Sequence, residues 1–112
     1  MVSRGEIYLA ALGEPIGHEQ GGDRPVLIVS ASAWLNSSPP VVAVVPLTRT
    51  FRQRSTHIEI ESGVSGLAAT SYAKCEDIRA ISPGRLRHKF GDADPMVMVR
   101  IDTLLRRLLG IE

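Results

Sequence analysis

The sequence predicts a mainly β fold, a small and strongly bent β-barrel covered by a C-terminal helix. Two observations predict this architecture. Five or six short segments rich in Val, Ile and alternating apolar residues are separated by turns containing Gly and Pro. One strong helical pattern follows them, at about residues 94–109. A length of 112 residues without repeats or linkers fits one domain spanning residues 1–112.

Three segments in the first half of the chain are predicted as strands. Residues 6–12 form a short candidate, and residues 25–31 and 41–47 are almost continuously apolar and β-branched. Such runs are typical of strands that are buried on both faces, or on one face and against a partner. Residues 34–40 form a turn-rich connection. Pro46 cannot donate a backbone hydrogen bond, so we expect a bulge or a strand end there.

Two further segments predict strands in the second half. Residues 56–61 alternate between a buried face and a solvent face, with Thr56, Ile58 and Ile60 on the first and His57, Glu59 and Glu61 on the second. Residues 68–81 predict one or two strands interrupted near Glu76 and Asp77.

The rest of the chain is predicted to be helical. Ser82 as a cap and Pro83 at the first helical position indicate a short helical turn. Asp94-Pro95 repeats this signal before the long helix, which Gly110 ends. The apolar stripe of that helix is formed by Val97, Ile101, Leu104, Leu105 and Leu108.

Composition limits the compartment and the cofactors. Cys75 is the one cysteine, which excludes an intramolecular disulfide, favours a reducing compartment and predicts a packed thiol rather than a nucleophile. The sequence has no long apolar run and no apolar leader, so we expect a soluble cytoplasmic protein without a membrane partner. The three histidines are widely spaced, and no recognised metal or nucleotide motif occurs. We therefore expect neither a metal nor another cofactor.

A basic loop follows the third strand candidate. It contains Arg49, Arg52 and Arg54 without any acidic residue, and Phe51 lies among them. Guanidinium groups pair with phosphates and an aromatic ring can stack on a base, which favours single-stranded nucleic acid as a ligand. The alternative is a solvated hairpin loop that arginine keeps soluble.

The stretch GHEQGGDRPVLIVS, residues 17–30, is richer in polar groups than a turn requires. Pro25 restricts Arg24 to extended backbone conformations, and Glu19 and Gln20 could orient the guanidinium or bond to a base edge. The paired glycines let backbone amides approach a ligand closely. The alternative is a polar Ω-type loop that leads into a core strand.

Together these pieces resemble the MazF/PemK family of toxin ribonucleases. The segments RGEIYLAALG, GHEQGGDRPVLIVS, VVAVVPLT, STHIEIE and CEDIRAIS occur in the family's order, followed by the terminal helix. The resemblance covers nearly the whole chain. It implies an SH3-like β-barrel of the MazF/PemK/CcdB type, a homodimer, and metal-independent cleavage of single-stranded RNA rather than DNA. It also implies a cognate MazE-like antitoxin whose disordered tail docks in the RNA groove.

The resemblance also assigns site residues. Arg24 matches the family's essential arginine, and Thr48 matches its active-site threonine. Ser71 matches a serine of the later strand, and His18 stands where many members carry serine. Asp77 stands where glutamine is common. We expect Arg24 and Thr48 to be catalytic, and the RNA-binding residues to be His18, Glu19, Gln20, Arg49, Phe51, Arg52, Arg54 and Ser71.

Three questions of function stay open at the level of sequence. The general base could be His18, Glu19 or an unusually perturbed Arg24. A gyrase-inhibiting toxin similar to CcdB is one alternative, although that activity uses a C-terminal tryptophan and the one tryptophan here is Trp34. A non-catalytic RNA-binding module of the same fold is the other alternative.

Overall fold

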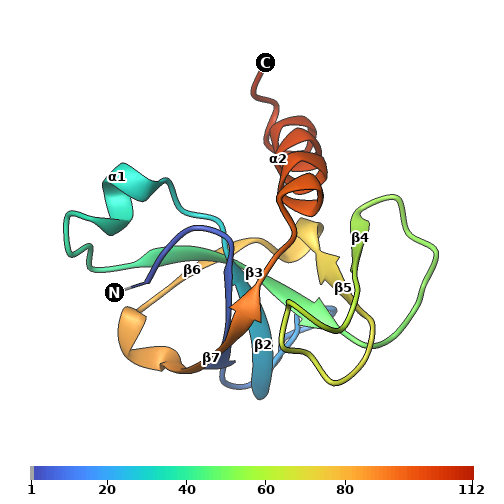
Figure 1. The fold of residues 1–112 in the computed structure, drawn as a ribbon, viewed down its shortest axis with the longest axis horizontal. Coiled ribbons are helices and arrows are strands. Elements are labelled where there is room, and N and C mark those ends of the chain that lie inside the picture. The colour runs from blue at the N-terminus through green and yellow to red at the C-terminus, as the bar shows by residue number, and fades with distance from the viewer. Residues whose placement is uncertain (1) are drawn as a thin grey trace.

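Seven antiparallel strands form one strongly bent sheet, and a C-terminal helix covers part of it (Figure 1). The computed structural model describes residues 2–112. The strand order is β4-β5-β3-β2-β1-β7, and β6 pairs with β3 outside this path. The elements are β1 (Glu6–Ala11), β2 (Asp23–Ile28), α1 (Ser32–Leu35), β3 (Val42–Thr48), β4 (His57–Ile60), β5 (Ser71–Lys74), η1 (Cys75–Asp77), β6 (Arg79–Ile81), η2 (Pro83–Arg85), β7 (Leu86–Asp92) and α2 (Pro95–Leu109). The predicted mainly β class with a C-terminal helix is confirmed.

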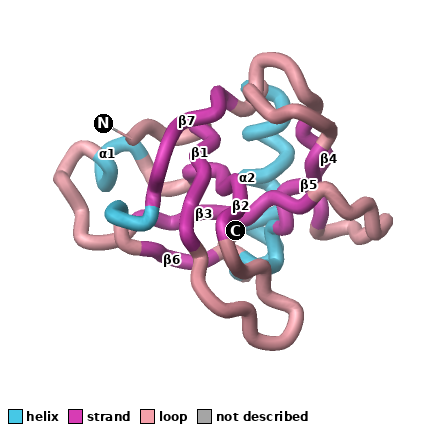
Figure 2. The backbone as a smooth tube through the Cα atoms, turned by 90° about the horizontal axis from the view of Figure 1, so that it is seen from below, coloured by secondary structure: helices cyan, strands magenta, loops and turns pink. Residues whose placement is uncertain are grey.

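Strand β3 is the centre of the sheet because it has partners on both sides. One side pairs with β2, and the other pairs first with β6 at Val42–Val44 and then with β5 at Leu47 and Thr48. Pro46 lies inside β3, opposite Val26 of β2. On the other side of β3 it falls between the residues that pair with β6 and those that pair with β5. A residue without an amide proton is tolerated there because neither β6 nor β5 pairs with it. Figure 2 shows the result, with β6 and β4 on opposite sides of the molecule.

The sheet has an apolar core on each of its faces. Leu27 and Val45 belong to one core, which α2 covers, while Val26 and Val44 belong to the other, which α1 helps to cover. Successive residues of a strand point to opposite faces. The continuous apolar runs of β2 and β3 therefore supply both cores, and the predicted burial on both faces is confirmed.

Helix α2 begins and ends as its capping residues predict. The Asp94 carboxylate accepts a hydrogen bond from the Met96 amide at 2.8 Å, and Gly110 adopts a left-handed φ of 70° that closes the C-terminus. Ile101 and Leu105 are buried, and the helix contacts β4 and η1. The apolar stripe is shorter than predicted, since Leu108 is 40% exposed beyond the edge of the sheet.

Three local predictions are wrong. Residues 86–92 lie in strand β7, although the chain after residue 81 was expected to be helical. This strand has few apolar side chains and is stabilised by pairing with β1, including the 2.8 Å ion pair between Lys89 Nζ and Glu6 Oε2. Helix α1 is a single turn inside the predicted connection, and the Ser82 side chain makes no capping bond before η2.

Candidate nucleic-acid interface

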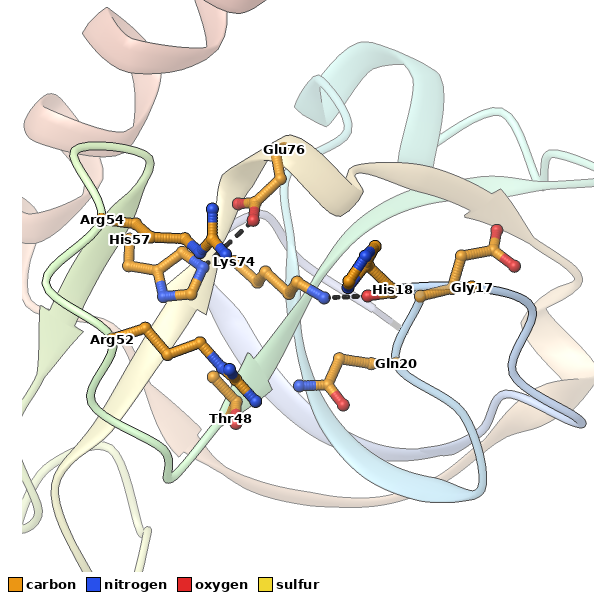
Figure 3. Close-up of a pocket in the computed structure, with 10 residues that line it drawn as sticks. Gly17, His18, Gln20, Thr48, Arg52, Arg54, His57, Lys74 and Glu76 are labelled. Carbon is orange, nitrogen blue, oxygen red and sulfur yellow. Dashed lines mark hydrogen bonds and ion pairs between the residues drawn. The ribbon is translucent and has the colours of Figure 1, made fainter.

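Four segments that are distant in sequence line one cavity of about 470 Å³ (Figure 3). They are the loop between β1 and β2, the end of β3, the basic loop with the start of β4, and the end of β5 with η1. The lining residues are Gly17, His18, Glu19, Gln20, Thr48, Arg52, Arg54, His57, Lys74 and Glu76. Six of the ten residues predicted from the sequence therefore line one cavity: His18, Glu19, Gln20, Thr48, Arg52 and Arg54.

Three side chains give the cavity its positive charge. Arg52, Arg54 and Lys74 lie around Thr48, and within residues 2–112 no ion pair to a carboxylate engages any of the three. The Thr48 hydroxyl accepts a hydrogen bond from the Thr50 amide at 3.2 Å, which leaves its own proton free to donate. Free cations beside a hydroxyl donor suit a phosphate group.

The loop between β1 and β2 forms one wall of the cavity and folds back on itself. The Gly22 amide donates to the Gly13 carbonyl at 2.7 Å, and the Leu12 amide donates to the Gly22 carbonyl at 2.9 Å. A Cβ atom at Gly21 would lie 2.5 Å from Cδ of Pro15. The paired glycines therefore serve the internal packing and the turn of the loop. The sequence had instead suggested that they let backbone amides approach a ligand.

Three side chains outside the loop hold this wall in place. The Lys74 ammonium donates to the His18 carbonyl, as Figure 3 shows. The Gln20 backbone amide donates to Asp77 Oδ2 at 2.9 Å, and Arg79 Nη2 donates to the Gln20 backbone carbonyl at 3.0 Å. The polar side chains of residues 18–20 consequently have a defined position relative to the cations on the opposite wall.

His57 and Glu76 form a pair at the back of the cavity. His57 Nε2 lies 3.1 Å from Glu76 Oε2, and the imidazole is only 3% exposed, so its predicted place on the solvent face is wrong. The cause is η1, which carries Glu76 over the start of β4. Burial alone would raise the pKa of Glu76, but contacts with its own backbone amide, His57 and Thr56 hold that pKa below its usual value.

Arg24 lies outside the cavity lining. Its Nε donates to the Gly21 carbonyl at 3.2 Å, and its side chain is exposed. The β2–β3 register pairs Val26 with Pro46, so continuing it by two residues places Arg24 opposite Thr48. Directly opposite residues have Cβ atoms about 4.5–5.5 Å apart. The structure pairs β2 with β3 as far as Val26 and Pro46, so Arg24 and Thr48 lie two residues beyond the last pair, at the same end of the two strands.

The other predicted residues have different surroundings. Arg49 and Phe51 are exposed in the basic loop, and the Phe51 ring lies 5.4 Å from that of Tyr72. Ser71 is 3% exposed and donates to the Ala69 carbonyl at 3.3 Å, so it is not part of the cavity surface. Sequence reasoning missed Tyr72 and Lys74, although strand alternation along β5 places them on one face.

The structure also bears on the thiol, on metal binding and on membrane spans. Cys75 is fully buried, as predicted, and burial together with the charge of Glu76 raises its pKa to about 12. Within residues 2–112, no cluster of three His, Cys, Asp or Glu side chains has the arrangement of a metal site. In the same part of the chain, no helix is both long and apolar enough to span a bilayer.

Known proteins resemble this chain over almost its whole length. A family model described as a PemK-like, MazF-like toxin of type II toxin–antitoxin systems matches residues 3–109. Endoribonuclease EndoA of Bacillus subtilis (strain 168) is 33% identical over 112 residues, which cover 99% of this chain and 97% of that protein. An endoribonuclease from a mycobacterial species, solved in complex with its cognate antitoxin, has a TM-score of 0.80 at 28% identity and covers 100% of this chain and 98% of its own. MazF from Deinococcus radiodurans shares the fold, with a TM-score of 0.84, 21% identity and coverage of 98% and 97%.

Proposed function

Since the chain belongs to the PemK-like, MazF-like family of type II toxins, we propose that it cleaves single-stranded RNA at a phosphate held by Arg24 and Thr48. It is an endoribonuclease toxin, as the names of its relatives indicate. One observation about the site carries the proposal, namely that Thr48 shares a cavity with three cationic side chains that form no ion pair with any carboxylate of residues 2–112. Such a cavity attracts the backbone of a nucleic acid.

The reaction needs no group beyond the substrate and the protein. The ribose 2′-hydroxyl loses its proton to a base and attacks the adjacent phosphorus, forming a new O–P bond. The bond from phosphorus to the 5′-oxygen breaks, and that oxygen takes up a proton. The products are a 2′,3′-cyclic phosphate and a 5′-hydroxyl. Arg24 would stabilise the charge that develops on the phosphate with its planar donors, and the Thr48 hydroxyl would donate to a phosphate oxygen.

Several parts of the cavity support RNA binding. Arg52 and Arg54 face it from the basic loop and suit phosphates, while the neighbouring pair of Phe51 and Tyr72 suits stacking of a base. His18, Glu19 and Gln20 present polar groups for base edges. We place Arg49 among the phosphate contacts and keep Ser71 as a proposed contact that requires β5 to move, since Ser71 is buried here.

The partners follow from the family. We propose that a MazE-like antitoxin neutralises the toxin by placing an acidic tail in the same cavity, because the free cations would bind its carboxylates as they bind phosphates. The mycobacterial neighbour was solved with its cognate antitoxin. We also propose that the chain folds as one domain, acts in the cytoplasm as a homodimer, and does not cleave DNA, which lacks the 2′-hydroxyl.

A cleavage assay tests the proposal. Purified protein is incubated with a long single-stranded RNA, with and without excess EDTA, and the fragments are separated on a denaturing gel. We expect discrete cuts that survive EDTA. A gyrase-inhibiting toxin or a non-catalytic binding module would leave the RNA intact, and cleavage that EDTA abolishes would overturn the metal-independent mechanism.

A further inference from the structure

The wall of the cavity that carries His18, Glu19 and Gln20 depends on few contacts with the rest of the fold. Between residues 14 and 20, the hydrogen bonds that leave the loop go to Lys74, Asp77 and Arg79. Residues 13–19 are exposed. A segment with many exposed residues and few anchoring contacts opens locally at low cost. These three anchors therefore determine how well the wall is ordered.

Asp77 makes the anchor with the sharpest geometry. Its Oδ2 accepts a hydrogen bond from the backbone nitrogen of Gln20, 2.9 Å away and 57 residues earlier in the sequence. A bond from an amide to a carboxylate is charge-assisted and stronger than a neutral one. Arg79 holds the carbonyl of the same residue at 3.0 Å, so both backbone groups of Gln20 are bonded to the segment from η1 to β6.

We propose that Asp77 is a positioning residue that determines base selectivity, because it orders residues 18–20 as the base-reading wall of the cavity. This inference rests on the proposed function, in which RNA occupies the cavity. Asp77 lines a smaller neighbouring cavity of about 200 Å³ but not the cavity that contains Thr48. Its carboxylate is bonded to the Gln20 backbone amide, so it acts on the Thr48 cavity through the loop.

Phosphate contacts and base contacts come from different parts of the cavity, so we expect a loss of Asp77 to change base selectivity rather than RNA affinity. Contacts to phosphates position a nucleic acid, and contacts to base edges specify its sequence. Arg52, Arg54 and Lys74 supply positive charge from the wall opposite the loop or from β5. The loop supplies His18, Glu19 and Gln20, whose side chains can donate to and accept from bases. Disordering the loop would remove discrimination between bases and leave the cationic surface intact.

Three variants separate this role from a general effect of charge. Asp77→Ala removes the acceptor, whereas Asp77→Asn keeps an oxygen that can accept the Gln20 amide proton. Glu14→Ala is the matched control, because it removes one negative charge from the exposed part of the same loop. Hydrogen exchange of the Gln20 backbone amide, measured by NMR, reports whether its hydrogen bond to residue 77 is intact. Cleavage of an RNA library randomised around the cut site reports selectivity.

We expect the Gln20 amide of Asp77→Ala to exchange roughly tenfold faster or more, since a hydrogen bond to a charged group is worth at least a tenfold change in the opening equilibrium. We expect base selectivity to fall by a similar factor. Glu14→Ala should resemble the wild type in both measurements, and Asp77→Asn, which keeps a neutral acceptor, should lie between the wild type and Asp77→Ala. Unchanged exchange in Asp77→Ala, or faster exchange with full selectivity, would overturn the proposal. Failure of the wild-type protein to cleave the library would instead refute the proposed function, while the exchange measurement would still report the anchor.

Discussion

Arg24 lies opposite Thr48 when the pairing of Val26 with Pro46 is continued to the end of both strands. Both residues still belong to the sheet, since Arg24 pairs with Ala10 and Thr48 pairs with Tyr72. The guanidinium is folded back onto the Gly21 carbonyl at 3.2 Å. The proposed role requires this exposed side chain to rotate so that its donors point toward the threonine. Two residues that are far apart in sequence thus lie at the same end of adjacent strands, where we propose that cleavage occurs.

Arg24→Ala should therefore leave a folded protein with much reduced cleavage. Removal of one preorganised donor to a developing charge typically costs roughly 10²–10³-fold in kcat. The exposed side chain contributes little to the core, so the thermal unfolding midpoint should stay close to that of the wild type. Initial cleavage rates on a short RNA and circular dichroism melts check both parts. Near-normal turnover by a well-folded variant would remove Arg24 from the mechanism.

Much of the fold is predictable because local patterns and tertiary packing agree. The apolar runs of β2 and β3 indicated two buried faces, and the caps at Asp94 and Gly110 bounded α2. Strand β7 was not predictable in the same way, since its hydrogen bonds to β1 stabilise it rather than its own apolar pattern. Period-two alternation placed His57 in solvent, whereas in the fold its imidazole is 3% exposed and lies 3.1 Å from Glu76 of η1.

The candidate site was predictable as a set of residue types but not as a geometry. The motif around residues 18–20 and the basic loop lie in one cavity, as their shared chemistry suggests. Lys74 at the end of β5 and Glu76 in η1 were missed because a single lysine or glutamate carries no local signal. Their role becomes visible only when β5 is placed between β3 and β4.

Replacing Arg49, Arg52 and Arg54 together by glutamine should weaken RNA binding and reduce its dependence on salt. For single strands, each lost phosphate contact lowers the slope of log K against log salt by about 0.7. Fluorescence anisotropy of a labelled, uncleavable RNA at several salt concentrations gives this slope. The matched control replaces three exposed arginines of α2, Arg100, Arg106 and Arg107. A slope equal to that of the wild type would identify the loop as a solvated hairpin.

The thiol of Cys75 should be unreactive in the folded protein. Only the thiolate is nucleophilic, and burial with the charge of Glu76 raises the pKa of this thiol to about 12. Iodoacetamide at pH 8 should leave the native protein unlabelled by mass spectrometry and label it fully in urea. Rapid labelling of the native protein would show that the β5–η1 region opens far more readily than its burial indicates.

Glu76 should make stability dependent on pH in the acid range. Its pKa in the folded protein lies below the usual 4.5 on balance, because favourable contacts with its backbone amide, His57 and Thr56 outweigh burial. Ionised Glu76 therefore stabilises the fold above about pH 4.5, and this contribution is lost as the pH falls through the folded-state pKa. Urea unfolding should show Glu76→Gln less stable than the wild type at pH 7, with a gap that narrows as the pH is lowered below 4.5. Glu14→Gln, in an exposed loop, should show no such difference; a constant gap for Glu76→Gln at all pH values would contradict the prediction.

The internal-attack mechanism predicts the behaviour of an RNA that lacks a single oxygen. Replacing the attacking 2′-hydroxyl by hydrogen removes the nucleophile and leaves the phosphates and bases in place. This oligonucleotide should bind about as tightly as its parent, since phosphate contacts dominate the affinity. It should also remain uncut and compete with the parent RNA for the cavity. Mass spectrometry of the parent's products should find a 2′,3′-cyclic phosphate or 3′-phosphate on one fragment and a 5′-hydroxyl on the other. Cleavage of the substituted RNA at the same bond, or products with 5′-phosphates, would require water as the nucleophile instead.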